Sequence, residues 1–261
     1  MSAIFDAVQA KLNRIPEKIK DIQACADAYA ARYPPEVIVD SEGKATLDMS
    51  TPAPIDISIL AGEAIYQMRS ALDHLAFHLV KLNPNGSTLP LKWEDNCEFP
   101  LWTEHKVGQI TPLPYGCFGK LPGISKQAHA FIESVQPYYR TGKVNNSLRF
   151  LKELCNRDKH RYLVVIRSRS QVHESRTWLN RTISTGYRAL DHGAEINLFE
   201  RSIGSDSNVQ VNFKLAGFIT FNEPILGEGA CSIPVQELLQ HMLDSVQGVI
   251  VPAFNKLINN P

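Results

Sequence analysis

The segment from Ile57 to Leu82 constrains the fold more than any other part of the chain. Its large apolar residues recur at spacings of mostly three and four, which is the period of a helix with one buried face. They are Leu60, Ile65, Met68, Leu72, Leu75, Leu79 and Leu82. The other faces are filled largely by Ala61, Ala64, Ala71, Ala76, Phe77 and Val80. A helix with so little polar surface has to be buried on most sides, so this segment predicts the central helix of a bundle.

Further helices are predicted on both sides of this segment. The helical period runs from Ser2 to about Tyr33, with Pro16 as a kink or a division, and returns over about 125–135, 146–160 and 235–258. Between 83 and 123 the chain is rich in Pro, Gly and aromatic residues and has no period. Loops of this length are usually functional or packed by their own side chains. We expect packing by Trp93, Phe99, Trp102, Tyr115 and Phe118.

Two regions have the composition of β-structure. The runs EVIVD and ATLDM flank a turn at Gly43 and predict a small N-terminal hairpin. The runs YLVVI, AEINLF and VQVNFKLAGFITF lie between Arg161 and Glu223 and predict an antiparallel sheet. The fold class is therefore α+β, a helical bundle core with an antiparallel sheet in the C-terminal half. We expect a single compact domain over 1–261, with its helical part at about 1–160 and 235–261 and its β-rich part at about 161–225.

Composition and charge exclude several classes of protein. Hydrophobic residues make up 44% of the chain, which is enough for a sizeable core, and 27 basic residues balance 27 acidic ones. With no global positive field, contact with RNA requires a local patch. No secretory signal or membrane-spanning run is present, and the five cysteines form no CxxC pair. These features predict a cytoplasmic protein with reduced thiols and no membrane partner.

A cluster of ionisable residues interrupts the apolar helix at Arg69, Asp73 and His74. Residues four apart are neighbours on a helix, so Arg69 can pair with Asp73, Ser70 with His74, and His74 with His78. Burial of such groups costs free energy unless they are paired and hydrogen-bonded. Arg69, Asp73 and His74 are therefore the candidate functional site.

The densest run of ionisable groups lies at the end of another predicted helix. It contains Asn156, Asp158, His160 and Arg161, which could supply the partners that the cluster needs. We expect these supporting residues to contact Arg69, Asp73 and His74. The alternative is a solvated helix end, where the helix dipole favours basic side chains.

The letters from Arg69 to His74 spell R-x4-H, with Ser70 directly after the arginine, and this resembles the signature of the HEPN superfamily. That superfamily comprises helical ribonucleases and nucleotide-binding proteins. A wider pattern of AGEAIYQMRSALDHLAFHL, EFPLW, LPGIS, VQPYY and NRDKHR resembles a family of uncharacterised bacterial and phage-associated proteins. Both resemblances include the predicted helix that contains Arg69 and His74.

The HEPN resemblance implies a metal-independent endoribonuclease, an activity suited to a defence or toxin effector. His74 would assist proton transfer, since imidazole titrates near neutrality, and Arg69 would neutralise the scissile phosphate. Asp73 joins them as the partner of Arg69. Many HEPN enzymes assemble their site at a dimer interface, so the resemblance also implies a homodimer with RNA as its partner. No cofactor and no metal are expected.

Two other interpretations remain open. In the first, the Arg69, Asp73 and His74 network is structural, in an RNA-binding, protein-binding or scaffold protein without chemistry. In the second, His74 and His78 have the spacing of metal ligands on a helix, and Asp73, Asp158 or His160 could complete the shell. The sequence contains no HExxH, GxSxG, Walker or GxGxxG motif, so the chemistry of those motifs is not expected.

Overall fold

The computed structural model describes residues 3–42, 44–104, 120–139, 142–160, 166–178, 181–196, 210–222 and 232–259. The chain divides into two compact units. The first comprises Met1–Asp21, Ile59–Val164 and Gln236–Pro261, and the second comprises Ile22–Ser58 and Val165–Val235. The combination of a helical core with a small antiparallel sheet confirms the predicted α+β class. The expected single domain stays a prediction.

The N-terminal helical stretch is divided, as Pro16 predicts. Helix α1 spans Ala3–Leu12 and α2 spans Ile15–Arg32, with a turn at Asn13 and Arg14 between them. Pro16 is the second residue of α2, where a missing backbone N–H removes no intrahelical hydrogen bond. The division therefore follows from the one residue that cannot continue the preceding helix.

Helix α3, Ile55–Leu82, is the buried helix that the apolar pattern predicts. Ala64, Ala71 and Ala76 are fully buried, as are the large side chains of its stripe from Ile65 to Leu75. The helix ends at Leu82 and is followed by Asn83, whose φ of 39° is left-handed. Asn tolerates this conformation better than most residues, so the chain turns away there.

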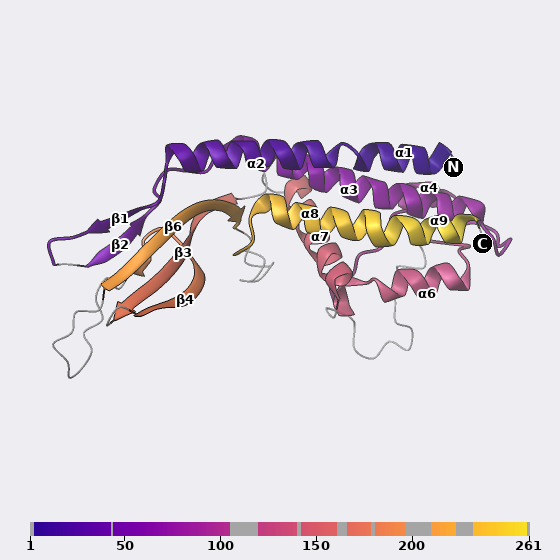
Figure 1. Cartoon of the computed structure of the whole chain (residues 1–261). Coiled ribbons are helices and arrows are strands. Elements are labelled where there is room, and N and C mark those ends of the chain that lie inside the picture. Colours follow the sequence, from indigo (N-terminus) through magenta and orange to yellow (C-terminus); the bar gives the residue numbers. More distant parts are fainter. Residues whose placement is uncertain are drawn as a thin grey trace. The chain divides into compact units, whose positions relative to one another are not determined.

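The remaining helices of the first unit are also confirmed. Helix α6 spans Lys126–Ser134 and is preceded by Ser125, whose Oγ caps the helix by accepting from the Ala128 N–H. Helix α7 spans Lys143–His160, and η1 is a short turn at Pro137–Tyr139. The last helical stretch consists of α8 (Val235–Ser245), a π-helical turn η4 (Val246–Ile250) and α9 (Val251–Asn259). In Figure 1, α1, α3, α8 and α9 run along one direction.

The long aromatic stretch packs by its own rings where the structure describes it. It contains a short helix, α4, at Trp93–Asn96, and the Trp93 ring stacks on Phe77 with centroids 5.1 Å apart. Phe99 is fully buried and contacts Phe254 of α9. Tyr115 and Phe118 lie outside the described residues.

The second unit contains two antiparallel sheets of three described strands each. The predicted hairpin is confirmed as β1 (Glu36–Val39) and β2 (Ala45–Asp48), and β5 (Glu195–Ile196) pairs with the far side of β2. Ala45, Leu47 and Ile196 form the small core of this sheet. Gly43 of the predicted turn lies outside the described residues.

The other sheet has the order β4-β3-β6 and differs in detail from the predicted runs. Its strands are β3 (Ile166–Trp178), β4 (Arg181–Leu190) and β6 (Gln210–Phe221). The run VQVNFKLAGFITF forms β6 as predicted, but the run AEINLF supplies β5 to the first sheet. Central strand β3 is a polar sequence, IRSRSQVHESRTW, whose backbone is paired on both sides. Periodicity did not predict this strand because its strand character comes from pairing rather than from an apolar face.

Candidate functional site

Arg69 and Asp73 form a bidentate ion pair one turn apart on α3. Arg69 Nε donates to Asp73 Oδ2 at 3.1 Å and Arg69 Nη2 donates to Asp73 Oδ1 at 2.8 Å. The Arg69 side chain is only 11% exposed, against 29% for Asp73. The two residues can pair because side chains four residues apart are neighbours on a helix, and their two parallel hydrogen bonds fix the plane of the guanidinium.

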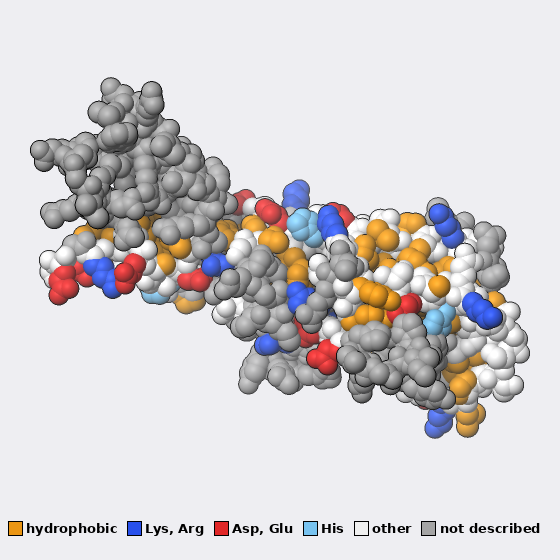
Figure 2. Space-filling model, turned by 90° about the horizontal axis from the view of Figure 1, so that it is seen from below, with side chains coloured by type: hydrophobic (Ala, Val, Ile, Leu, Met, Phe, Trp, Pro, Cys, Tyr) orange, Lys and Arg blue, Asp and Glu red, His pale blue; other side chains and the backbone are white. Residues whose placement is uncertain are grey.

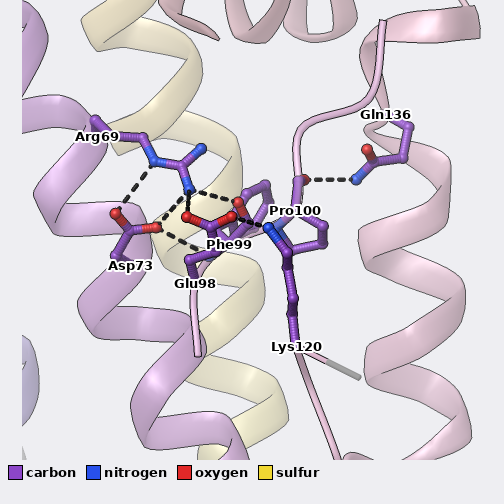
Figure 3. Close-up of polar contacts among 7 residues, drawn as sticks. All are labelled: Arg69, Asp73, Glu98, Phe99, Pro100, Lys120 and Gln136. Carbon is purple, nitrogen blue, oxygen red and sulfur yellow. Dashed lines mark hydrogen bonds and ion pairs between the residues drawn. The ribbon is translucent and has the colours of Figure 1, made fainter. Parts of the chain in front are cut away.

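The pair also holds a loop against α3. The Phe99 N–H donates to Asp73 Oδ1 at 2.9 Å, and Arg69 Nη2 donates to the Phe99 carbonyl at 2.8 Å (Figure 3). Both polar groups of a fully buried residue are thus satisfied by one ion pair. The Arg69 and Asp73 pair is therefore a structural clamp on the chain at Phe99.

A second clamp holds the same loop at Pro100 and Trp102. Gln136, which is fully buried, donates from Nε2 to the Pro100 carbonyl at 3.0 Å and accepts at Oε1 from the Trp102 N–H at 3.0 Å. Asn145 of α7 in turn donates to the Gln136 carbonyl at 2.9 Å. The backbone from Phe99 to Trp102 is consequently fixed at both ends.

A cavity of about 380 Å³ opens beside this fixed loop, and we call it the Arg69 cavity. Its described lining residues are Arg69, Glu98, Pro100, Leu101, Trp102, Lys120, Lys152, Cys155 and Asn156. Among them are three cations and one carboxylate, Glu98. Glu98 forms an ion pair with Lys120 and lies 3.4 Å from Arg69 Nη2. The described lining therefore carries an excess of positive charge.

One nitrogen of Arg69 remains available to this cavity. Nε and Nη2 are used by Asp73 and the Phe99 carbonyl, whereas Nη1 has no hydrogen-bond partner among the described residues. Figure 3 shows this nitrogen turned away from both partners. A guanidinium that is held rigid through Nε and Nη2 and keeps Nη1 unbonded is preorganised to bind an anion.

The predicted supporting residues are brought to α3 in part. Asn156 lies on α7 one turn after Lys152, and both line the Arg69 cavity. Asp158 does not lie near Arg69 but packs against Gly62, which is two helical turns earlier on α3. A Cβ atom added at Gly62 would lie only 2.7 Å from Asp158 Oδ1. Burial raises the pKa of the Asp158 carboxyl above its ordinary value. The His160 side chain and Arg161 lie outside the described residues.

His74 does not share a cavity with Arg69. It lines a separate cavity of about 370 Å³ with Asp73, Phe77, His78 and Cys97, which we call the histidine cavity. His74 lies five positions after Arg69, which is about 140° around a helix, so the two side chains leave α3 in different directions. Ser70 also faces away from the Arg69 cavity and accepts a hydrogen bond from Lys11 Nζ at 2.7 Å.

His74 and His78 lie side by side, as their spacing predicts. Among the described residues, no group of three His, Cys, Asp or Glu side chains is arranged to hold a metal ion. Burial lowers the pKa of both imidazoles, assisted for His74 by Lys11 and for His78 by His74. Both rings are therefore neutral at pH 7, because the ordinary imidazole value is about 6.5.

Several residues of the Arg69 cavity were absent from the sequence prediction. Glu98 and Trp102 lie in the run EFPLW, in which Trp102 was predicted only as a packing residue and Glu98 was given no role. Lys152 lies four residues before Asn156, a spacing that places them on one helix face. That spacing could have identified Lys152, whereas nothing local in the sequence indicates that Lys120 lies nearby.

Comparison of the chain with known protein families, curated proteins and solved structures finds no match. Within the described part of the chain, no helix is both long and apolar enough to cross a membrane. On the face drawn in Figure 2, the described Lys and Arg side chains stand singly rather than as a broad field.

Proposed function

We propose that the protein binds RNA and that a phosphate of the strand occupies the Arg69 cavity. The observation that carries the proposal is the rigid, half-used guanidinium of Arg69 on a wall that also presents Lys120 and Lys152. Arginine held in this way offers fixed donors to phosphate oxygens, and lysines add charge without fixed geometry. The HEPN resemblance supports RNA as the source of the phosphate.

The other lining residues suit a nucleic acid as well. Trp102 gives an aromatic face on which a base could stack, and Asn156 provides an amide that both donates and accepts hydrogen bonds. Proteins that bind single strands combine cationic grooves with such aromatic platforms. A single-stranded RNA is therefore the form of ligand that we propose.

Cleavage of the bound RNA, which the resemblance implies, stays a prediction. A joint action of Arg69 and His74 on one phosphate is not favoured within one chain, because the two residues line different cavities. Arg69 also holds the loop at Phe99 in place. Loss of activity on replacing Arg69 could therefore result either from a lost catalytic group or from a displaced loop. Binding is consequently the function that the geometry supports best.

The proposal is tested by fluorescence anisotropy with a labelled 12-nucleotide single-stranded RNA. Lys152→Glu should weaken binding about tenfold, since it reverses a charge at the phosphate. Lys152 is suited to the test because its hydrogen bond to Thr103 Oγ1 is long, at 3.4 Å, so its loss should cost the fold little. The matched control is Lys126→Glu at the exposed start of α6, which should leave the Kd unchanged. Equal affinities of the two variants, or no binding by the wild-type protein, would refute the proposal.

A further inference from the structure

A row of basic side chains on the N-terminal helices faces one stripe of α3. The basic row recurs at intervals of three and four and consists of Lys11 of α1, Arg14 of the turn, and Lys18 of α2. The stripe of α3 recurs at the same intervals and consists of Ile59, Glu63, Tyr66 and Ser70. All of these residues belong to the first compact unit.

Polar contacts join the basic row to α3 at both of its ends. Lys11 Nζ donates to Ser70 Oγ at 2.7 Å, and Lys18 forms an ion pair with Glu63. The row and the stripe therefore run antiparallel, with Arg14 between the two contacts. Among the residues that the structure describes, none forms an ion pair or a side-chain hydrogen bond with the Arg14 guanidinium. The middle of the row thus lacks the carboxylate that Glu63 supplies at one end.

A cavity of about 300 Å³ opens at Arg14, and we call it the cationic cavity. Its described lining residues are Ala10, Lys11, Arg14, Tyr66, Gln67 and Ser70. This described lining contains two cations and no carboxylate. A carboxylate that enters the cavity would meet a guanidinium and an ammonium in a recess, where water screens their attraction less than on open surface.

The same stripe of α3 exposes apolar side chains to solvent. Tyr66 is 54% exposed, and Ile59, two turns earlier, is 41% exposed. Tyrosine and arginine are among the residue types that contribute most to binding at protein interfaces. An exposed isoleucine gains free energy only when another apolar group covers it. The surface therefore combines a cation that lacks an acidic partner with apolar area that a partner protein could cover.

This combination fits an acidic segment of a protein better than a nucleic acid. The Glu63 side chain is 51% exposed between Ile59 and Tyr66, and its carboxylate would repel a strand that carries a phosphate at every nucleotide. A peptide can place one carboxylate at Arg14 and an apolar side chain on Tyr66 while it keeps its other acids away from Glu63. A free inorganic anion would use the cations but not the exposed apolar residues.

We propose that the cationic cavity is the docking site for an acidic segment of a partner protein. The partner inserts an Asp or Glu side chain between Lys11 and Arg14 and lays a neighbouring apolar side chain on Tyr66. Its carboxylate supplies the acid that the middle of the basic row lacks. The site shares no described lining residue with the Arg69 cavity and does not depend on the RNA binding proposed there.

Selection from a random 12-residue peptide library displayed on phage, with the full chain as the target, tests the proposal without a known partner. Peptides that also bind the Arg14→Glu variant are removed first, so that the remaining ones depend on Arg14. We expect these peptides to be enriched in Asp and Glu relative to the starting library. The Kd of one selected peptide is then measured by fluorescence anisotropy.

Variants of the peptide and of the protein test the individual contacts. Replacement of the peptide's acid by its amide, and Tyr66→Ala in the protein, should each weaken binding about tenfold. Arg14→Glu should bind the peptide once that acid is replaced by lysine, because opposite charges then face each other again. Arg14 and Tyr66 are exposed, so their variants should keep the wild-type melting temperature. Lys20→Glu, at an exposed lysine on another face of α2, is the matched control and should bind the peptide as wild type does.

Other occupants of the cationic cavity are distinguished with the same variants. Arg14→Glu should bind the 12-nucleotide RNA as wild type does, and Lys152→Glu should bind the peptide as wild type does. Weaker RNA binding by Arg14→Glu would assign the cavity to a nucleic acid instead. A wild-type dimer that Arg14→Glu dissociates, seen by analytical ultracentrifugation, would assign it to a second copy of the chain. Either result overturns the proposal, as does a selection without enrichment in Asp and Glu or a lysine peptide that fails to restore binding to Arg14→Glu.

Discussion

Arg69 shows how one side chain can be both structural and available for binding. Its Nε and Nη2 atoms hold Asp73 and the Phe99 carbonyl, while Nη1 remains without a partner among the described residues. The HEPN resemblance implied a catalytic arginine and a catalytic histidine acting together. At the scale of single residues, the structure separates Arg69 from His74 and gives each its own cavity.

The clamp made by Arg69 and Asp73 should contribute measurably to stability. Asp73→Asn removes the charge that faces a nine-tenths buried guanidinium and weakens the bonds to Arg69 and Phe99. Breaking a fully buried pair costs ~3–5 kcal/mol, and because Asp73 is partly exposed we expect about 2 kcal/mol. Urea denaturation measures this free energy of unfolding.

Glu63→Gln is the control for this prediction. Glu63 forms an ion pair with Lys18, but its side chain is 51% exposed, and such surface pairs contribute at most ~1 kcal/mol. If Asp73→Asn costs no more than Glu63→Gln, then the Arg69 and Asp73 pair is not a clamp.

At the scale of elements, the helices could be predicted and much of the sheet could not. Apolar residues at intervals of three and four fix a helix locally, which is why α3 and the division at Pro16 were predicted correctly. Strand β3 is defined by partners distant in sequence, so its polar letters did not reveal it. The same limit applies to the site: α3 supplied Arg69, Asp73 and His74, but Lys120 reaches the cavity from a distant segment.

The packing of α7 on α3 at Gly62 leads us to predict that Gly62→Ala destabilises the protein, which is the opposite of what helix propensity alone predicts. Ala is favoured over Gly inside a helix by about 1 kcal/mol. At Gly62, however, a Cβ would meet Asp158 Oδ1 at 2.7 Å and Cγ at 3.1 Å. We therefore expect Gly62→Ala to lower the free energy of unfolding, and to raise it by about 1 kcal/mol when Asp158→Ala is already present. Thermal or urea melts of the four proteins complete the cycle, and the same effect of Gly62→Ala in both backgrounds would disprove the contact.

At the scale of the whole molecule, the first compact unit holds the Arg69 cavity and the histidine cavity, and the second holds both described sheets. Equal numbers of acidic and basic residues leave no net charge to attract RNA from a distance. Recognition should therefore depend on the few cations at the cavities of the first unit. RNA affinity should then fall as salt rises, with a slope that reflects a small number of phosphate contacts.

The three tryptophans of the chain allow the central claim to be tested directly. Trp102 lines the Arg69 cavity, Trp93 stacks on Phe77 of the histidine cavity, and Trp178 ends β3 in the second unit. The measurement is a titration of ¹⁵N-labelled protein with a 12-nucleotide single-stranded RNA, following the three indole N–H signals by NMR. We predict that the Trp102 signal shifts on binding, that Trp178 does not move, and that Lys152→Glu suppresses the Trp102 shift. An unchanged Trp102 signal at RNA concentrations that saturate binding would contradict the claim that the RNA phosphate occupies the Arg69 cavity.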